Sequence, residues 1–135
     1  MLKLWQVLAL ILLGGAMWAL VTWNIARHPE QPLDQARAVW GYAMAPIGGL
    51  ISILLCKYLG RLKPEQLLPG VVLVGATAMM IDAIAIRWFG ELYRASDRAM
   101  MMVGASLMWG YGVALAMTVA WVAWRARRSA TAADS

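Results

Sequence analysis

One acidic residue stands inside a long apolar stretch in the second half of the chain. Asp82 lies within the sequence MMIDAIAI, with apolar side chains on both sides. A charged side chain near the centre of a membrane span costs roughly 2.5–3.5 kcal/mol to insert, so such an acid is a candidate functional site. It could bind a proton or a cation. The sequence favours the simpler interpretation, a buried acid that forms one hydrogen bond between helices, worth about 0.6 kcal/mol.

Other polar and aromatic side chains are predicted to lie at the depth of Asp82. Measured from the ends of the apolar stretches, Trp18, Tyr42, Ser106 and Trp109 are at a similar level. The other tryptophans fall near the ends of these stretches, where indole rings favour the headgroup layer. We therefore predict a polar intramembrane site formed by these five residues, in which Tyr42 and Ser106 donate hydrogen bonds.

Arg87 is close to Asp82 in the sequence, but it is predicted to lie on another face of the same helix. Five residues along a helix correspond to about 140° of rotation and about 7.5 Å of rise. Arg87 is predicted to extend toward the headgroups instead and to form an interfacial charge pair with Glu91, four residues later.

The composition indicates the solvent in which these residues are positioned. Hydrophobic residues make up 62% of the 135 residues and charged residues 14%, with a mean hydropathy of +0.64. Soluble domains are about 45–50% apolar and about 25% charged. This composition excludes a soluble enzyme. The net charge of +5 is placed mainly beside apolar stretches, which is typical of membrane-flanking residues and not of a nucleic-acid binder.

Four apolar stretches are long enough to cross a bilayer, which requires about 20 residues. They cover residues 4–23, 38–59, 71–89 and 100–124. Each is predicted to be a helix, because no backbone amide can remain unpaired in hydrocarbon. The predicted fold is all-α: one domain, residues 1–124, of four transmembrane helices running up-down-up-down. A basic tail, residues 125–135, is predicted to be disordered.

Two residues in the connectors are typical of helix starts. Asp34 precedes the second span, and Ser96 or Asp97 precedes the fourth. Asp34 is placed near the positive end of the second helix, where a negative charge is stabilising, and Ser96 or Asp97 is predicted to cap the fourth.

Small residues are predicted to bring the helices close together, since hydrophobicity alone does not hold helices together in lipid. Gly14-Gly15 lies in the first span, and Gly112-x-x-x-Ala116 is a pair of small residues in the fourth. Packing within one chain is favoured over a dimer interface, which stays an alternative.

The second span contains a predicted kink. Pro46 is followed by Gly48 and Gly49. A proline inside a helix removes one hydrogen bond, so we expect a bend and a freed carbonyl near the middle of this span.

The distribution of basic residues predicts the orientation. Seven of them flank the spans on the side of the amino terminus and five on the other side. Because the more basic side faces the cytoplasm, both termini are predicted to be cytoplasmic.

No motif indicates a cofactor, a metal site or an enzyme. The chain has one cysteine and one histidine, which excludes an internal disulfide and the usual zinc-ligand patterns. No nucleophile, phosphate-binding or dinucleotide-binding motif is present.

Two segments of the second half carry a resemblance. The sequences DAIAIRWFGELY (82–93) and WGYG (109–112) resemble an uncharacterised family of small four-helix bacterial inner-membrane proteins. The resemblance implies a fold and a location but no activity. Small multidrug exporters are similar only in size, because their acidic residue belongs to the first span, where this chain has none.

The sequence therefore predicts a small inner-membrane protein of non-enzymatic, accessory or structural type, as a subunit of a larger membrane complex. The alternative is a small proton- or cation-coupled transporter that acts as a homodimer around Asp82. Besides the lipid bilayer, the predicted partners are thus a second copy or other membrane proteins.

Overall fold

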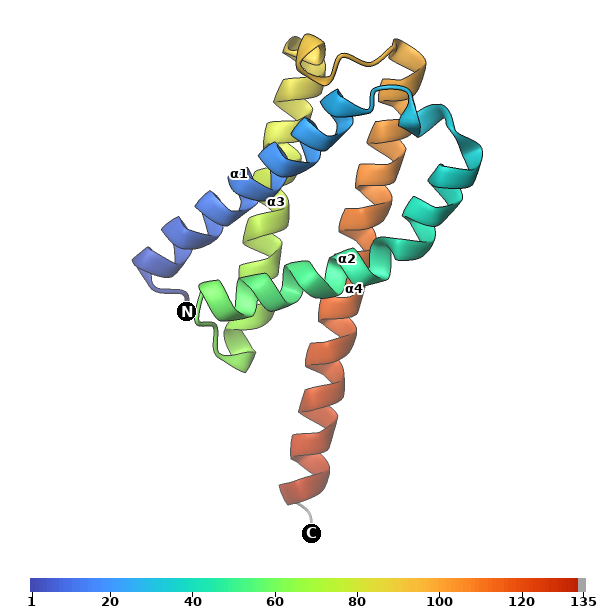
Figure 1. Ribbon diagram of the computed structural model, residues 1–135. Coiled ribbons are helices and arrows are strands. Elements are labelled where there is room, and N and C mark those ends of the chain that lie inside the picture. Colours follow the sequence, from blue (N-terminus) through green and yellow to red (C-terminus); the bar gives the residue numbers. More distant parts are fainter. Residues whose placement is uncertain (134–135) are drawn as a thin grey trace.

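The chain folds into four long helices joined by short connectors (Figure 1). The computed structural model describes residues 1–133, with side chains to residue 128. The long helices are α1 (Leu4–Arg27), α2 (Gln35–Leu59), α3 (Leu67–Trp88) and α4 (Asp97–Ala133). The connectors contain the 3₁₀ helices η1 (Gln31–Leu33), η2 (Pro64–Gln66) and η3 (Gly90–Tyr93). The described residues contain no strand, which confirms the all-α class, and all four helices are long and apolar enough to cross a membrane.

The helices are longer than the predicted spans. α3 begins at Leu67 and not at residue 71, and α4 extends from Asp97 to Ala133, past the predicted end at residue 124. In the structure, α4 continues as a helix through part of the segment predicted to be a disordered tail, as far as Ala133. Alanine and arginine have high helix propensity, and they are frequent between residues 123 and 133. Residues 134–135 of the predicted tail lie outside the described residues.

Side-chain caps define two helix starts. The Asp34 carboxylate accepts a hydrogen bond from the Ala36 amide at 3.0 Å and begins α2. The Ser96 hydroxyl accepts one from the Ala99 amide at 3.3 Å, directly before α4 begins at Asp97. Asp34 lies at the start of α2 as predicted and also caps it, and of the two candidate caps for α4 the structure uses Ser96.

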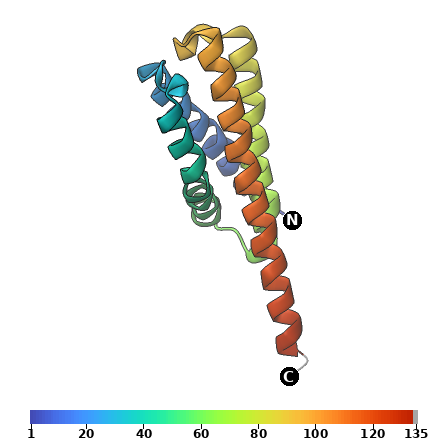
Figure 2. The ribbon, with the colours of Figure 1, turned by 90° about the vertical axis from the view of Figure 1, so that its right-hand side faces the viewer.

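The helices pack in two close pairs, α1 with α3 and α2 with α4 (Figures 1 and 2). Gly14 sits so close to α3 that an added Cβ would lie 2.9 Å from the carbonyl oxygen of Val74. Gly49 would place a Cβ 3.3 Å from Cα of Ala114 on α4. These two glycines therefore allow close packing within one chain.

The Gly112-x-x-x-Ala116 pair is not used in this way. Both residues are exposed, and a Cβ on Gly112 would meet no atom within 4 Å in the described chain. The predicted preference for packing within the chain is wrong for this pair, because it lies on the face of α4 turned away from the other helices.

α2 changes direction near its middle, in the part that contains Pro46 (Figure 1). The proline has no N–H to donate to the Tyr42 carbonyl, four residues earlier. Trp109 on α4 supplies the missing donor: its indole Nε1 donates to the Tyr42 oxygen at 3.1 Å. The two rings also stack, with centroids 5.7 Å apart. Trp109 therefore joins α4 to the bend of α2 through a hydrogen bond and a stacked ring.

Hydrogen bonds close the end of the bundle that carries the amino terminus. The Gln6 side chain donates to the Gly60 carbonyl at 2.9 Å, and the Gln66 side chain donates to the Met1 carbonyl at 2.7 Å. A buried apolar cluster lies behind them, formed by Leu10, Ile53, Cys56, Leu62, Leu67, Val71 and Val74. Near the opposite end, the side chain of Tyr93 in η3 is fully buried.

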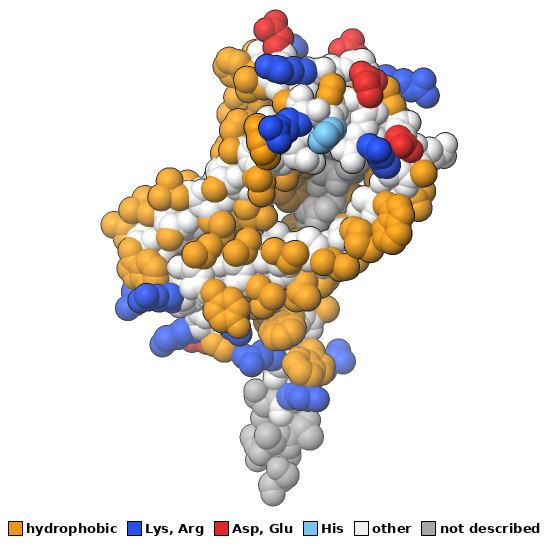
Figure 3. Space-filling model, in the orientation of Figure 1, with side chains coloured by type: hydrophobic (Ala, Val, Ile, Leu, Met, Phe, Trp, Pro, Cys, Tyr) orange, Lys and Arg blue, Asp and Glu red, His pale blue; other side chains and the backbone are white. Residues whose placement is uncertain are grey.

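The outer surface is apolar around its middle and charged at its two ends (Figure 3). Most of the large apolar side chains there point outward. In the most apolar window of α4, only 6% of the residues are buried inside the structure. Exposed apolar area on this scale is unusual for a soluble monomer and fits a multi-pass membrane protein.

Candidate functional site

Asp82 connects three elements of the fold through its carboxylate. The side chain is 7% exposed. The Tyr111 hydroxyl of α4 donates to Oδ2 at 2.7 Å, and the Tyr93 hydroxyl of η3 donates to Oδ1 at 3.4 Å. A distance of 2.7 Å is typical of a hydroxyl that donates to an ionised carboxylate. The contact with Tyr111 is therefore the stronger of the two.

The carboxylate of Asp82 has no basic partner among the residues that the structure describes. Asp82 forms no ion pair with any side chain that the structure describes, Arg87 included. The predicted pair of Arg87 with Glu91 is also absent from the described residues. Both side chains are exposed, and α3 ends at Trp88, so Glu91 falls in η3 and loses the helical spacing on which the prediction depended.

Two polar atoms of α1 face the same region and make no hydrogen bond. They are Nε1 of Trp18 and Oγ1 of Thr22, both buried. Thr22 is 8% exposed. Both side chains lie near the Tyr93 hydroxyl, and Trp18 also lies near Asp82. A buried polar group without a partner costs about 1–3 kcal/mol. Of the two residues, only Trp18 lines the cavity beside Asp82, so its Nε1 marks a position where a bound acceptor or water would be stabilised.

Tyr93 remains a hydroxyl donor at neutral pH. Burial at the end of the bundle raises the pKa of its phenol above the ordinary value. Because the neutral phenol keeps its proton, it can donate to Asp82 without adding a second negative charge next to it.

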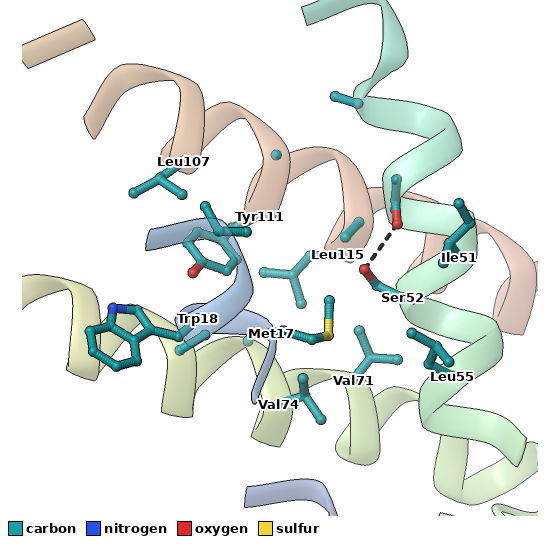
Figure 4. A pocket seen from close by; sticks show the side chains of 18 of the residues that line it. Met17, Trp18, Ile51, Ser52, Leu55, Val71, Val74, Leu107, Tyr111 and Leu115 are labelled. Carbon is teal, nitrogen blue, oxygen red and sulfur yellow. Dashed lines mark hydrogen bonds between the residues drawn. The ribbon is translucent and has the colours of Figure 1, made fainter. Parts of the chain in front are cut away.

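A cavity of about 470 Å³ opens beside Asp82, lined by residues of all four long helices (Figure 4). Trp18 and Tyr111 lie on one side of it, and Val71, Leu55 and Leu115 are among the apolar side chains on the other. Sites for small molecules commonly enclose about 300–1,000 Å³ and are mostly apolar with a few polar groups. The cavity has both the size and the polarity of such a site.

Glycines on three helices leave this space unfilled. Gly48, Gly75 and Gly110 line the cavity, and a Cβ added to any of them would meet no atom within 4 Å. Gly75 lies seven residues before Asp82, which places the two on the same face of α3 about two turns apart. The apolar part of the cavity therefore continues along the helix from the carboxylate.

The cavity opens sideways between α1 and α2. Leu20 and Val21 of α1 and Ile51 of α2 line it and are also exposed on the outside. In the space-filling view the surface is hollowed between these two helices (Figure 3). The hollow lies between the apolar flank of α2 and the charged side chains at one end of the molecule, and apolar residues of both helices form its rim.

The structure brings together three of the five residues predicted to form the site. Trp18 and Ser106 line the cavity with Asp82, and the Ser106 hydroxyl donates to the Met102 carbonyl at 2.9 Å. Tyr42 and Trp109 lie outside the cavity lining, 36% and 48% exposed. They stack at the bend of α2, and neither donates to Asp82.

Sequence reasoning missed the two hydroxyls that do contact Asp82, along with the nearby Thr22. Tyr111 lies inside the fourth predicted span, so its phenol could have been considered as a partner of Asp82. Comparing depths alone does not identify it. Tyr93 had no such signal, because it belongs to a connector and reaches Asp82 only where η3 folds back over the end of the bundle.

No family model matches the chain, and neither a curated protein nor a solved structure matches it. The site is therefore interpreted from its own chemistry. The described residues hold no group of three or more His, Cys, Asp or Glu side chains that could bind a metal ion. What the arrangement offers is an apolar cavity with one carboxyl, neighbouring hydroxyls and aromatic rings at its polar end.

Proposed function

We propose that this chain is a multi-pass protein of the bacterial inner membrane, with four helices running up-down-up-down and both termini in the cytoplasm. The four apolar helices and the apolar belt support membrane insertion. The seven basic residues on the side of the termini, against five on the other, support the orientation. The resemblance of residues 82–93 and 109–112 to small four-helix inner-membrane proteins supports the location.

Within the bilayer, the protein acts as a non-enzymatic binding protein for a lipophilic small molecule. The cavity of about 470 Å³ holds the molecule, and Asp82 contacts its polar end. This cavity is the observation that carries the proposal. Helices in lipid are held together by close contacts, and an unfilled space forfeits them. If Asp82 had only a structural role, its hydrogen bonds with Tyr111 and Tyr93 would be sufficient. Such a role would not explain why glycines on three helices leave a space open beside it.

A protein that binds such a molecule can transport it if the carboxylate exchanges a proton for a bound cation. A buried carboxylate without a basic neighbour must be compensated by a proton or by a bound cation. Asp82 meets this condition among the described residues. A small proton- or cation-coupled transporter is therefore the form of the proposed function that the site favours.

A second candidate function, an accessory subunit of a larger membrane complex, is favoured by a different observation. Gly112 and Ala116 form an exposed strip of small residues on α4, where another helix could approach closely. Under this alternative, Gly112→Leu would release the protein from a larger complex in mild detergent. Recovery of the wild-type chain alone under the same conditions would contradict it.

The proposed function can be tested with a neutral lipophilic dye. Nile red fluorescence is measured in nanodiscs that contain the protein, and the signal of empty nanodiscs is subtracted. We expect saturable binding to the wild type. Gly75→Leu should abolish it, because the new side chain extends into the cavity, whereas Gly15→Leu should retain it, because Gly15 lies outside the cavity lining with open space around its Cβ position.

Helix content and elution volume of both variants should match the wild type, which separates a filled cavity from a misfolded protein. The proposal is overturned if the dye binds wild-type nanodiscs no better than empty ones. It is equally overturned if a correctly folded Gly75→Leu protein binds the dye as the wild type does.

A further inference from the structure

The charge at the polar end of the cavity indicates the class of ligand. Of the described residues that line the cavity, Asp82 alone carries a formal charge, and it is negative. The two side chains that donate hydrogen bonds to it, Tyr111 and Tyr93, are neutral. No lysine, arginine or histidine lies among the lining residues, so a bound anion would meet a like charge and no counter-charge.

Aromatic rings flank the same end. Trp18 and Tyr111 both line the cavity, and they lie on the same side of it in Figure 4. The face of an aromatic ring attracts a cation by about 0.5–2 kcal/mol, with the larger values in desolvated sites.

We infer that the cavity selects lipophilic organic monocations, such as protonated aryl amines or quaternary phosphonium ions, which reach it from the bilayer through the opening between α1 and α2. Asp82 neutralises the charge, the rings of Trp18 and Tyr111 flank it, and the glycine-lined part of the cavity receives the apolar groups. This inference rests on the proposed function and specifies its ligand.

The physical argument is one of compensation inside a medium of low dielectric constant. A lone carboxylate is unfavourable there, and the attraction between opposite charges is much stronger than in water. A cation therefore removes the cost of the carboxylate, a neutral ligand leaves this cost in place, and an anion increases it. Affinity is expected to decrease in that order for molecules of the same shape.

The path of access follows from the same geometry. Leu20 and Val21 of α1 and Ile51 of α2 line the cavity and are exposed on the outer surface. The opening between these two helices is therefore bordered by apolar side chains. Lipophilic ions partition into bilayers, so they are present at the level of this opening, whereas strongly hydrated inorganic ions are not.

The test compares two ions of the same shape and opposite charge. Tetraphenylphosphonium and tetraphenylborate are used to displace Nile red from the wild-type protein in zwitterionic nanodiscs. Their concentrations are corrected for partitioning into empty nanodiscs. We expect the cation to displace the dye at a concentration roughly tenfold or more below that of the anion, a ratio that corresponds to about 1.4 kcal/mol.

Two substitutions assign this preference to a single carboxylate. Asp82→Asn should remove the difference between the two ions while the dye still binds. Asp34→Asn is the matched control, since it removes one negative charge from an exposed helix cap where asparagine functions equally well, and it should keep the wild-type ratio.

The failure of this inference differs from the failure of the proposed function. If the dye binds saturably but both ions displace it equally from the wild type, or if the Asp82→Asn protein keeps the preference, the selectivity for cations is refuted and the cavity remains a neutral lipophilic site. If the dye does not bind, the proposed function itself fails. The wild-type ratio decides the inference even if Asp82→Asn does not fold.

Discussion

α1 packs closely against α3 because Gly14 has no side chain. Gly14 is therefore the most informative residue to change. A Cβ at Gly14 would lie 2.9 Å from the Val74 carbonyl oxygen and 3.1 Å from Cβ of Thr77. Both neighbours are rigid, one a backbone atom and the other a branched Cβ, so α1 and α3 would have to separate by a few tenths of an ångström. Overpacking of this kind typically costs about 1–3 kcal/mol.

The adjacent glycine provides an internal control. A Cβ at Gly15 would meet nothing within 4 Å. Both substitutions to alanine gain the same helix propensity, about 0.8–1 kcal/mol relative to glycine. The difference in unfolding free energy between Gly14→Ala and Gly15→Ala therefore isolates the packing effect, and we expect Gly14→Ala to be less stable by about 1–3 kcal/mol.

The assay is unfolding by increasing amounts of sodium dodecyl sulfate in mixed micelles, followed by the loss of helical circular dichroism. Each variant is compared with the wild type in the same micelle composition. Equal stability of the two variants would refute the close contact between α1 and α3. A Gly15→Ala protein that is less stable than Gly14→Ala would show that the opposite face of α1 carries the packing.

Two further predictions use the same unfolding assay. Tyr111→Phe should destabilise the protein by about 1 kcal/mol and Tyr93→Phe by less, because their hydroxyls lie 2.7 Å and 3.4 Å from the buried carboxylate; the reverse order would contradict the site geometry. Trp109→Phe should cost about 1–3 kcal/mol by leaving the Tyr42 carbonyl without its donor. This cost should decrease in a Pro46→Ala background, where the helix supplies a backbone donor again, and an unchanged cost in the double variant would refute the assigned partner.

The positions of the four helices could be predicted from the spacing of charged residues, because a membrane span requires a long apolar stretch whatever its partners are. The start of α2 could also be predicted, since the contact of Asp34 with the Ala36 amide is local in the sequence. The extension of α4 past residue 124 was not predicted, because basic and small polar residues there are typical of a solvated tail. The alanines in the same segment favour a helix.

The partners of Asp82 could be predicted only in part, for a geometric reason. Matching residues by depth fixes their height in the bilayer but not their rotation about the helix axis. Trp109 and Tyr111 are at nearly the same height, but two residues correspond to about 200° of rotation, so only one of them can face the cavity. The structure turns Tyr111 inward, and Trp109 lies at the bend of α2.

The bend in α2 could also be predicted only in part. Pro46 predicted a freed carbonyl from the sequence alone, since the missing N–H is a covalent property of proline. The identity of the donor that compensates it could not be predicted. It comes from Trp109, 67 residues away from Tyr42 in the sequence, and depends on how α2 and α4 are placed against each other.

The cavity itself has no local sequence signature. Glycines such as Gly75 and Gly110 appear the same in the sequence whether another helix or an empty space lies opposite. Gly14 and Gly15 are neighbours with opposite environments in the structure. Only the arrangement of all four helices determines which glycines allow close packing and which leave room for a ligand.

The central claim is that a lipophilic molecule from the bilayer occupies the cavity beside Asp82. Photolabelling tests it most directly: the protein in nanodiscs is irradiated with a neutral aryl diazirine, with and without an excess of the same molecule lacking the diazirine, and the labelled residues are mapped by mass spectrometry. We predict labels on cavity residues such as Met17, Ala78 and Leu115 that the competitor removes, while labels on outward residues such as Met101 persist. Labels confined to the outer apolar surface, or cavity labels that the competitor does not reduce, would contradict the claim.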